Sequence, residues 1–164
     1  MTRTRNLLSL IIGSAFGLGL APIAPGSFGA LLGVGFHILV ALYLPLGAQI
    51  PALGIGLLLV SAANNWLTPW AIDYWKNEDP PHFVLDEVAG YLVVPILFRA
   101  GTPLEVTLWG FFLFRIFDIV KIPPARQIDR HWHGKWGILL DDIVSGTYAA
   151  LALHTLAWLG VITN

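Results

Sequence analysis

Long apolar segments, interrupted by few polar residues, dominate the pattern of this chain. No Asp, Glu, Lys or Arg occurs from Asn6 to Ile72. A transmembrane helix needs about 20 mostly apolar residues, so this interval has room for two spans. The stretches "FGALLGVGFHILVALYLPL" (28–46) and "PALGIGLLLVSAANNWLTPWAI" (51–72) predict them. The connector between them, residues 47–50, is short, so the two spans are expected to form a helical hairpin.

Three later apolar segments carry charged residues near one end. They cover residues 82–98, 103–120 and 138–162. The opening segment, residues 7–20, is short for a span and is expected to be an interfacial or re-entrant helix. The pattern therefore predicts an all-α polytopic membrane protein with about four or five transmembrane helices plus this short N-terminal helix.

The composition agrees with a protein whose solvent is largely lipid. Charged residues make up 12% of the chain and hydrophobic residues 56%, whereas soluble domains carry about 25% charged residues. A length of 164 residues predicts a single membrane-embedded domain over residues 1–164. The net charge of −1 gives no basic field for nucleic acid. The absence of cysteine excludes disulfides, a cysteine nucleophile and cysteine-based metal sites.

The charged residues predict an orientation. With a cytoplasmic N-terminus and alternating spans, only Arg99 of the nine basic residues falls on the outer side. The positive-inside rule supports this arrangement. Most of the acids fall on the same cytoplasmic side, with Glu105 as the exception. Carboxylates inside apolar segments are costly unless they pair, bind a cation or line a wet cavity, so a shared polar pocket is expected there.

The stretch "FFLFRIFDIVK" (111–121) contributes one face to this pocket. Arg115, Asp118 and Lys121 recur every three residues, which places them on one side of a helix. Two further segments bring adjacent acids, Asp86–Glu87 and Asp141–Asp142. Neighbouring carboxylates repel, and a shared divalent cation relieves that repulsion. Oxygen ligands favour Mg²⁺, with Mn²⁺ possible. Ordinary interfacial ion pairs remain the alternative.

Two further segments have a polar or irregular character. "GLGLAPIAPGSFG" (17–29) breaks any helix through residues 21–26, and Ser27 is expected to cap the next helix. This segment is either an anion site at a helix N-terminus or a simple turn. The loop 121–137 carries Arg126 and Arg130, which either attract anionic lipid or bind a phosphate group. His131 and His133 in the same loop are either site residues or part of an interfacial belt with the neighbouring tryptophans.

Four blocks, in order, resemble the phosphatidylglycerophosphatase A family. They are "GLGLAPIAPGSFG" (17–29), "DPPHFVLDEVAG" (79–90), "FRIFDIVKIPP" (114–124) and "DRHWHGKWGILLDD" (129–142). Ser27 stands where threonine is common in the family, and one departure is visible, because Ile122 replaces the proline usual after Lys121. The resemblance implies Mg²⁺-dependent hydrolysis of phosphatidylglycerophosphate to phosphatidylglycerol and phosphate, in a multi-pass protein of the bacterial inner membrane. Its expected partners are this substrate and membrane lipids, with the site on the cytoplasmic side.

The residues and the resemblance together give a hypothesis for the site. The expected catalytic residues are Asp86, Glu87, Arg115, Asp118 and Lys121. The expected metal ligands are Asp86, Glu87, Asp118, Asp141 and Asp142, and the expected phosphate-binding residues are Gly26, Ser27, Arg126 and Arg130. The sequence leaves open one metal ion or two, attack by water or by an aspartate, and the oligomeric state. The main alternative function is a small ion or solute transporter with acidic membrane residues.

Overall fold

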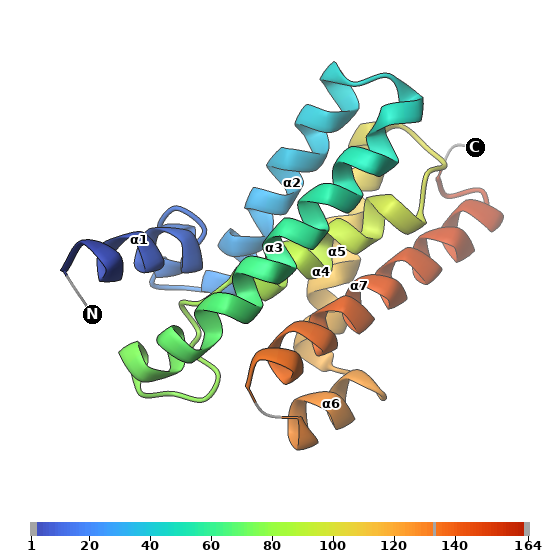
Figure 1. Ribbon diagram of the computed structural model, residues 1–164. Helices are drawn as coiled ribbons and strands as arrows, with labels where there is room; N and C mark the ends of the chain where they lie inside the picture. The colour runs from blue at the N-terminus through green and yellow to red at the C-terminus, as the bar shows by residue number, and fades with distance from the viewer. Residues whose placement is uncertain (1–2, 133, 163–164) are drawn as a thin grey trace.

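The computed structural model describes residues 3–132 and 134–162, and the described part is almost wholly helical, with no strand (Figure 1). The elements are α1 (Arg3–Gly13), the short 3₁₀ helix η1 (Leu18–Leu20), α2 (Pro25–Tyr43), α3 (Leu46–Trp75), α4 (Leu85–Leu97), α5 (Pro103–Val120), α6 (Ala125–His131) and α7 (Lys135–Trp158). The prediction of an all-α membrane protein with a short N-terminal helix is confirmed.

Three of these helices are long and apolar enough to cross a membrane, namely α2, α3 and α7. The two other predicted spans differ from them. α4 has 13 residues, about 20 Å of helix, which is shorter than a hydrocarbon core of about 30 Å. α5 has 18 residues but includes Glu105, Arg115 and Asp118. Length and composition therefore support three spans of the four or five expected.

The predicted hairpin of the first two spans is present, but its boundaries differ. α2 ends at Tyr43 and α3 begins at Leu46, so residues 47–50 are helical rather than a connector. Pro45 has an extended backbone (φ −64°, ψ 151°) and stands directly before the helix. Pro51 lies inside α3, where the ring removes a single backbone hydrogen bond near the helix end. The second helix of the hairpin therefore begins directly after Pro45, and not at Pro51 as predicted.

α4 is the centre of the bundle, since it contacts α2, α3, α5 and α7. Most of its side chains are buried, including Tyr91 and Leu92. Two glycines allow α4 and α7 to touch backbone to backbone. A Cβ on Gly146 of α7 would collide with the carbonyl oxygen of Gly90, and a Cβ on Gly90 would lie 2.8 Å from the carbonyl oxygen of Asp142. This contact sets the position of the acids at the start of α4 against those near the start of α7.

Five helix termini meet at one end of the bundle (Figure 1). They are the N-termini of α2, α4 and α7 and the C-termini of α3 and α5, with α6 beside them. α1 lies at the same end, next to α3, and does not run through the bundle. Most charged residues of the apolar segments are therefore delivered to this end of the bundle, whereas Glu105 stands in the first turn of α5, at the other end.

Candidate active site

A cavity of about 470 Å³ opens at this end of the bundle. Its walls come from the start of α2, the loop before α4, the start of α4, the end of α5, α6 and the start of α7. Ten charged residues line it: Glu78, Asp79, Asp86, Glu87, Arg115, Asp118, Lys121, Asp129, Asp141 and Asp142. Eight of these are acids and two are bases. By formal charge the lining is therefore negative, and a bound cation would favour the entry of a phosphate group.

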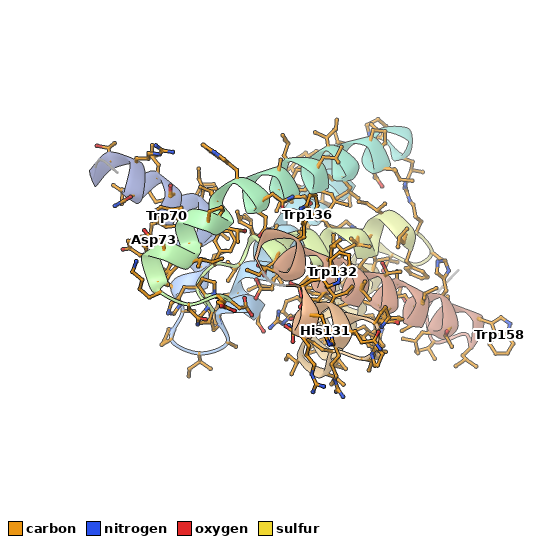
Figure 2. All side chains as sticks on the ribbon, turned by 60° about the horizontal axis from the view of Figure 1, so that its bottom comes forward. Trp70, Asp73, His131, Trp132, Trp136 and Trp158 are labelled. Carbon is orange, nitrogen blue, oxygen red and sulfur yellow. The ribbon has the colours of Figure 1, made fainter. Side chains whose placement is uncertain are left out.

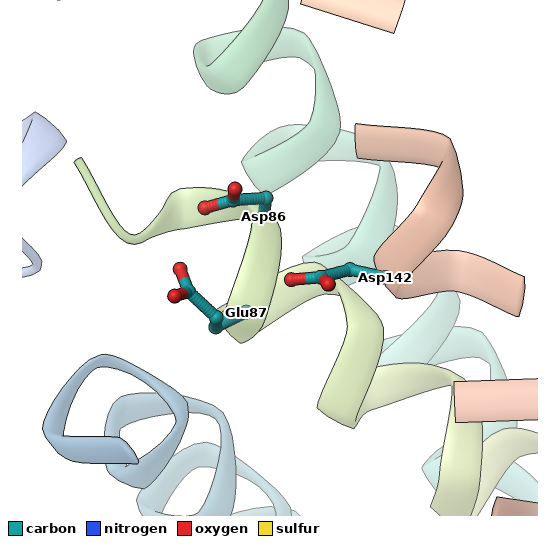
Figure 3. Close-up of side chains that lie close together, drawn as sticks. All are labelled: Asp86, Glu87 and Asp142. Atoms are coloured by element: carbon teal, nitrogen blue, oxygen red, sulfur yellow. The ribbon is translucent and has the colours of Figure 1, made fainter. Parts of the chain in front are cut away.

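Three carboxyl groups come together in the wall of this cavity. Asp86 and Glu87 occupy the first turn of α4, and Asp142 faces them from α7 (Figure 3). One carboxylate oxygen from each residue lies within 4.8 Å of the other two. Asp86 and Asp142 are buried, and the Oδ1 atom of Asp86 and the Oε2 atom of Glu87 accept no hydrogen bond from any described residue. Buried, unpaired carboxylates at this spacing have the donor chemistry of a site for a hard divalent cation such as Mg²⁺.

Arg115 and Asp118 add a buried ion pair on α5, one turn apart. Both side chains are nearly buried and both line the cavity. Gly26, at the start of α2, makes room for them. A Cβ at this position would overlap the carboxylate of Glu87 and lie 3.1 Å from Nη1 of Arg115. The glycine therefore lets the N-terminus of α2 approach both charged groups.

Lys121 completes the face that α5 presents to the cavity. Its Nζ donates to Oδ1 of Asp129 on α6 and to Oδ2 of Asp141 on α7, each at 2.6 Å. Burial disfavours the charged ammonium, but the hydrogen bonds with Asp129 and Asp141 outweigh that cost and raise the pKa of Lys121 above its ordinary value. Lys121 thus stays charged and links three helices around the cavity. Arg115, Asp118 and Lys121 all line this one cavity, as the spacing along α5 predicts.

The structure places three of the four expected phosphate-binding residues outside the cavity lining. Ser27 is the third residue of α2 and not its cap, because the helix already begins at Pro25 and Ala24 occupies the cap position. Proline is well suited to the first helical position, which explains the earlier start. Arg126 is exposed and donates to the carbonyl oxygen of Val120 at 3.1 Å. Arg130 is exposed on α6. Of the four, Gly26 alone lines the cavity.

Three acids of the cavity, Glu78, Asp79 and Asp129, were not among the expected site residues. Asp129 bonds Lys121, and Asp79 lies in the loop that closes the cavity before α4. The available signal for Asp79 and Asp129 was their position, since each begins one of the four blocks quoted above, and Glu78 directly precedes the second block. His131 is exposed on α6, where its ring contacts the carbonyl oxygen of Gln127 at 2.8 Å, and it lies outside the lining. His133 falls outside the described residues.

Comparison with known proteins agrees with the four sequence blocks. Residues 11–157 match the family described as Phosphatidylglycerophosphatase A. The chain is 32% identical to a protein of Bacteroides thetaiotaomicron named "Putative phosphatidylinositol-3-phosphatase", over 93% of this chain and 96% of that protein. It is 32% identical to the Phosphatidylglycerophosphatase A of Escherichia coli K12, over 88% of this chain and 80% of that one.

A third relative extends this pattern to another bacterium. The Phosphatidylglycerophosphatase A of Haemophilus influenzae is 29% identical over 90% of this chain and 88% of its own length. No solved structure matches the chain. The family match spans nearly all of the described helices, including every segment that lines the cavity. The chain therefore belongs to the phosphatidylglycerophosphatase A family.

Proposed function

We propose that residues 1–164 act as one membrane-embedded lipid phosphatase, which hydrolyses phosphatidylglycerophosphate to phosphatidylglycerol and inorganic phosphate. The observation that carries the proposal is the meeting of the carboxyl groups of Asp86, Glu87 and Asp142 with Arg115 and Lys121 in one cavity. The cavity lies at the end of an apolar bundle, where a lipid phosphate can enter while its acyl chains stay in the bilayer. Membership of the family supports the same reaction.

The proposed metal ion is Mg²⁺, and Mn²⁺ would suit the same oxygen ligands. Asp86, Glu87 and Asp142 would hold it, and Asp118 and Asp141 line the same cavity and could complete the ligand set. When bound, such an ion neutralises phosphate oxygens and makes water a stronger nucleophile near neutral pH. The unpaired oxygens of Asp86 and Glu87 are the feature of this chain that fits a cation.

The cationic side chains would orient the phosphate group. Arg115 offers a planar fork that can hold two phosphoryl oxygens, and its Nε has no hydrogen-bond partner among the described residues. Lys121 supplies a second positive charge, held in place by Asp129 and Asp141. Gly26 stands in the first turn of α2, where a helix has backbone N–H groups without acceptors inside it, although the N–H of Ser27 already donates to the carbonyl oxygen of Ala24 at 2.9 Å. Together these groups would stabilise the charge that develops on the transferring phosphoryl group.

We further propose that the cavity faces the cytoplasm from the bacterial inner membrane. The proposal rests on the basic residues, of which only Arg99 falls on the other side. The transporter alternative is weaker, because the charged lining belongs to one end of the bundle. A permeation path would also need polar groups at the middle and at the far end of the spans.

Phosphate release by the purified protein tests the proposed function. Phosphatidylglycerophosphate should be hydrolysed in the presence of Mg²⁺ and not in excess chelator. Phosphatidylinositol 3-phosphate is the comparison substrate, because one relative carries the name of a phosphatase for that lipid. A higher kcat/KM for phosphatidylinositol 3-phosphate would reassign the substrate. Failure to release phosphate from either lipid would reject the proposed function.

A further inference from the structure

The N-terminal segment turns its apolar side chains away from the protein. Seven large apolar residues are exposed there: Leu7, Leu8, Ile11, Ile12, Phe16, Leu20 and Ile23. We call them the apolar ridge. The side that faces the bundle instead holds the small residues Ser9, Gly13, Ser14 and Ala15. An apolar surface of this extent is unfavourable in water, so the ridge is expected to contact lipid or another protein.

The segment is fixed firmly to the rim of the cavity. Trp70 Nε1 of α3 donates to Oδ1 of Asn6 at 3.4 Å, and Val84 N donates to the carbonyl oxygen of Gly13 at 3.0 Å. His82 also contacts the segment, through its Nδ1 and the carbonyl oxygen of Gly19 at 2.8 Å. The chain continues directly from Ile23 into Ala24 and Pro25, which line the cavity. The position of the ridge therefore fixes the position of the cavity mouth.

The lengths of the candidate spanning helices and the aromatic residues at their ends indicate where the membrane surfaces pass. Trp136 and Trp158 are exposed near the two ends of α7 (Figure 2). The rise of helix between them is about 33 Å, close to a hydrocarbon core of about 30 Å. On α2, Pro25 and the exposed Tyr43 are separated by about 27 Å of helix. Exposed Trp and Tyr favour the two membrane interfaces, so one interface passes at the level of Trp136 and Pro25, where the cavity lies.

We propose that α1 and η1 lie in the plane of this interface, with the apolar ridge inserted among the lipids. α1 has 11 residues, about 17 Å of helix, which is too short to cross the core. An in-plane position covers its exposed face. Trp132, directly after α6, and Trp136, at the start of α7, are exposed as well. The partner is the lipid surface itself. This consequence rests on the proposed lipid phosphatase function: the ridge holds the mouth of the cavity at the level of the lipid phosphate groups.

The depth of the ridge can be measured without reference to activity. The chain has no cysteine, so single spin labels can be attached to Phe16→Cys and Ile23→Cys in lipid vesicles. Leu58→Cys, exposed within α3, serves as the reference for the hydrocarbon core, and Gln127→Cys, exposed on α6, as the reference for water. Both ridge labels should contact oxygen more than a water-soluble nickel complex, at a depth between the two references. Labels as open to the nickel complex as that at Gln127 would overturn the proposal.

Activity on two substrates separates membrane anchoring from general damage. The double variant Phe16→Asp/Ile23→Asp should lose at least tenfold in rate on phosphatidylglycerophosphate in vesicles. Its rate on a short-chain, water-soluble analogue should stay within twofold, as should both rates of the control Gln127→Asp. Equal loss on both substrates, or no loss on either, would overturn the proposal. If the unmodified protein hydrolyses neither substrate, the proposed function fails, while the label depths still decide the position of the ridge.

Discussion

At Asp142, we expect the charge of the side chain, and not its shape, to determine metal binding and activity. It is buried beside Asp86 and Glu87, and the three carboxylates repel one another. Asp142→Asn keeps the side-chain volume and removes one negative charge. We expect at least a hundredfold loss of kcat, a higher Mg²⁺ concentration for half-maximal activity and a smaller rise of Tm on addition of Mg²⁺.

In the metal-free protein, the Asp142→Asn substitution should be stabilising. Without a cation, loss of one of three repelling charges should raise Tm in chelator. Asp73→Asn is the matched control, because Asp73 is exposed and pairs only with Lys76 among the described contacts. Thermal unfolding in detergent gives the Tm of each of the two variants, once with chelator and once with Mg²⁺. An Asp142→Asn protein whose Tm still responds fully to Mg²⁺ would remove Asp142 from the ligand set.

Arg115 is expected to act through the geometry of its guanidinium as well as through its charge. Arg115→Lys keeps the positive charge but loses the planar fork. We expect kcat to fall more than tenfold, which corresponds to about 1.4 kcal/mol of barrier. Arg126→Lys is the same chemical change on an exposed residue outside the cavity lining and should leave kcat within twofold. Similar kcat values for the two variants would return Arg115 to the role of a structural ion-pair partner.

At the scale of elements, the contact between α4 and α7 is the feature that assembles the site. Gly146→Ala would press a methyl group onto the carbonyl oxygen of Gly90 and force the two helices apart. We expect a loss of about 1–3 kcal/mol in stability, as for other overpacked positions, and a lost Tm response to Mg²⁺. Gly35→Ala is the control, since nothing lies within 4 Å of a Cβ there and the change should stabilise α2 by about 0.5–1 kcal/mol. Unfolding and Mg²⁺ titration of both variants test the contact.

The elements were more predictable from the sequence than the distances between them. Apolar runs and the charge-free interval predict the α2–α3 hairpin and the helical class, because lipid leaves the backbone few other choices. The boundary errors at Pro51 and Ser27 have a local cause, since a proline can lie inside a helix or begin one. The spacing of Arg115, Asp118 and Lys121 predicted one shared face, because residues three apart are neighbours on a helix.

Which acids meet across helices was less accessible from the sequence. The contact of Asp142 with Asp86 and Glu87 depends on the approach of α4 to α7 through Gly90 and Gly146. No pattern within either helix reports that approach. The link from Lys121 to Asp129 likewise depends on how α6 folds back beside α7. For the same reason, Arg126 and Arg130 were grouped with the site by their nearness in sequence, although they lie outside its lining.

At the scale of the whole molecule, the proposed orientation in the membrane rests on the distribution of basic residues. Gly47 lies at the end of the bundle opposite to the cavity, and Arg126 lies at the cavity end. In intact cells, an impermeant thiol reagent should label Gly47→Cys and spare Arg126→Cys. The cysteine-free parent is the background control. Labelling of Arg126→Cys alone would place the cavity on the outer face.

The eight carboxyl groups around the cavity also predict an order for the proposed metal-dependent reaction. We expect these charges to weaken the binding of a phosphomonoester until a cation offsets them. Addition should therefore be compulsory, with the cation first and the lipid second. The KM for the lipid should fall as Mg²⁺ rises, and inorganic phosphate should protect the protein from unfolding only when Mg²⁺ is present. The rate of phosphatidylglycerol production would then follow the free Mg²⁺ on the side of the membrane that the cavity faces.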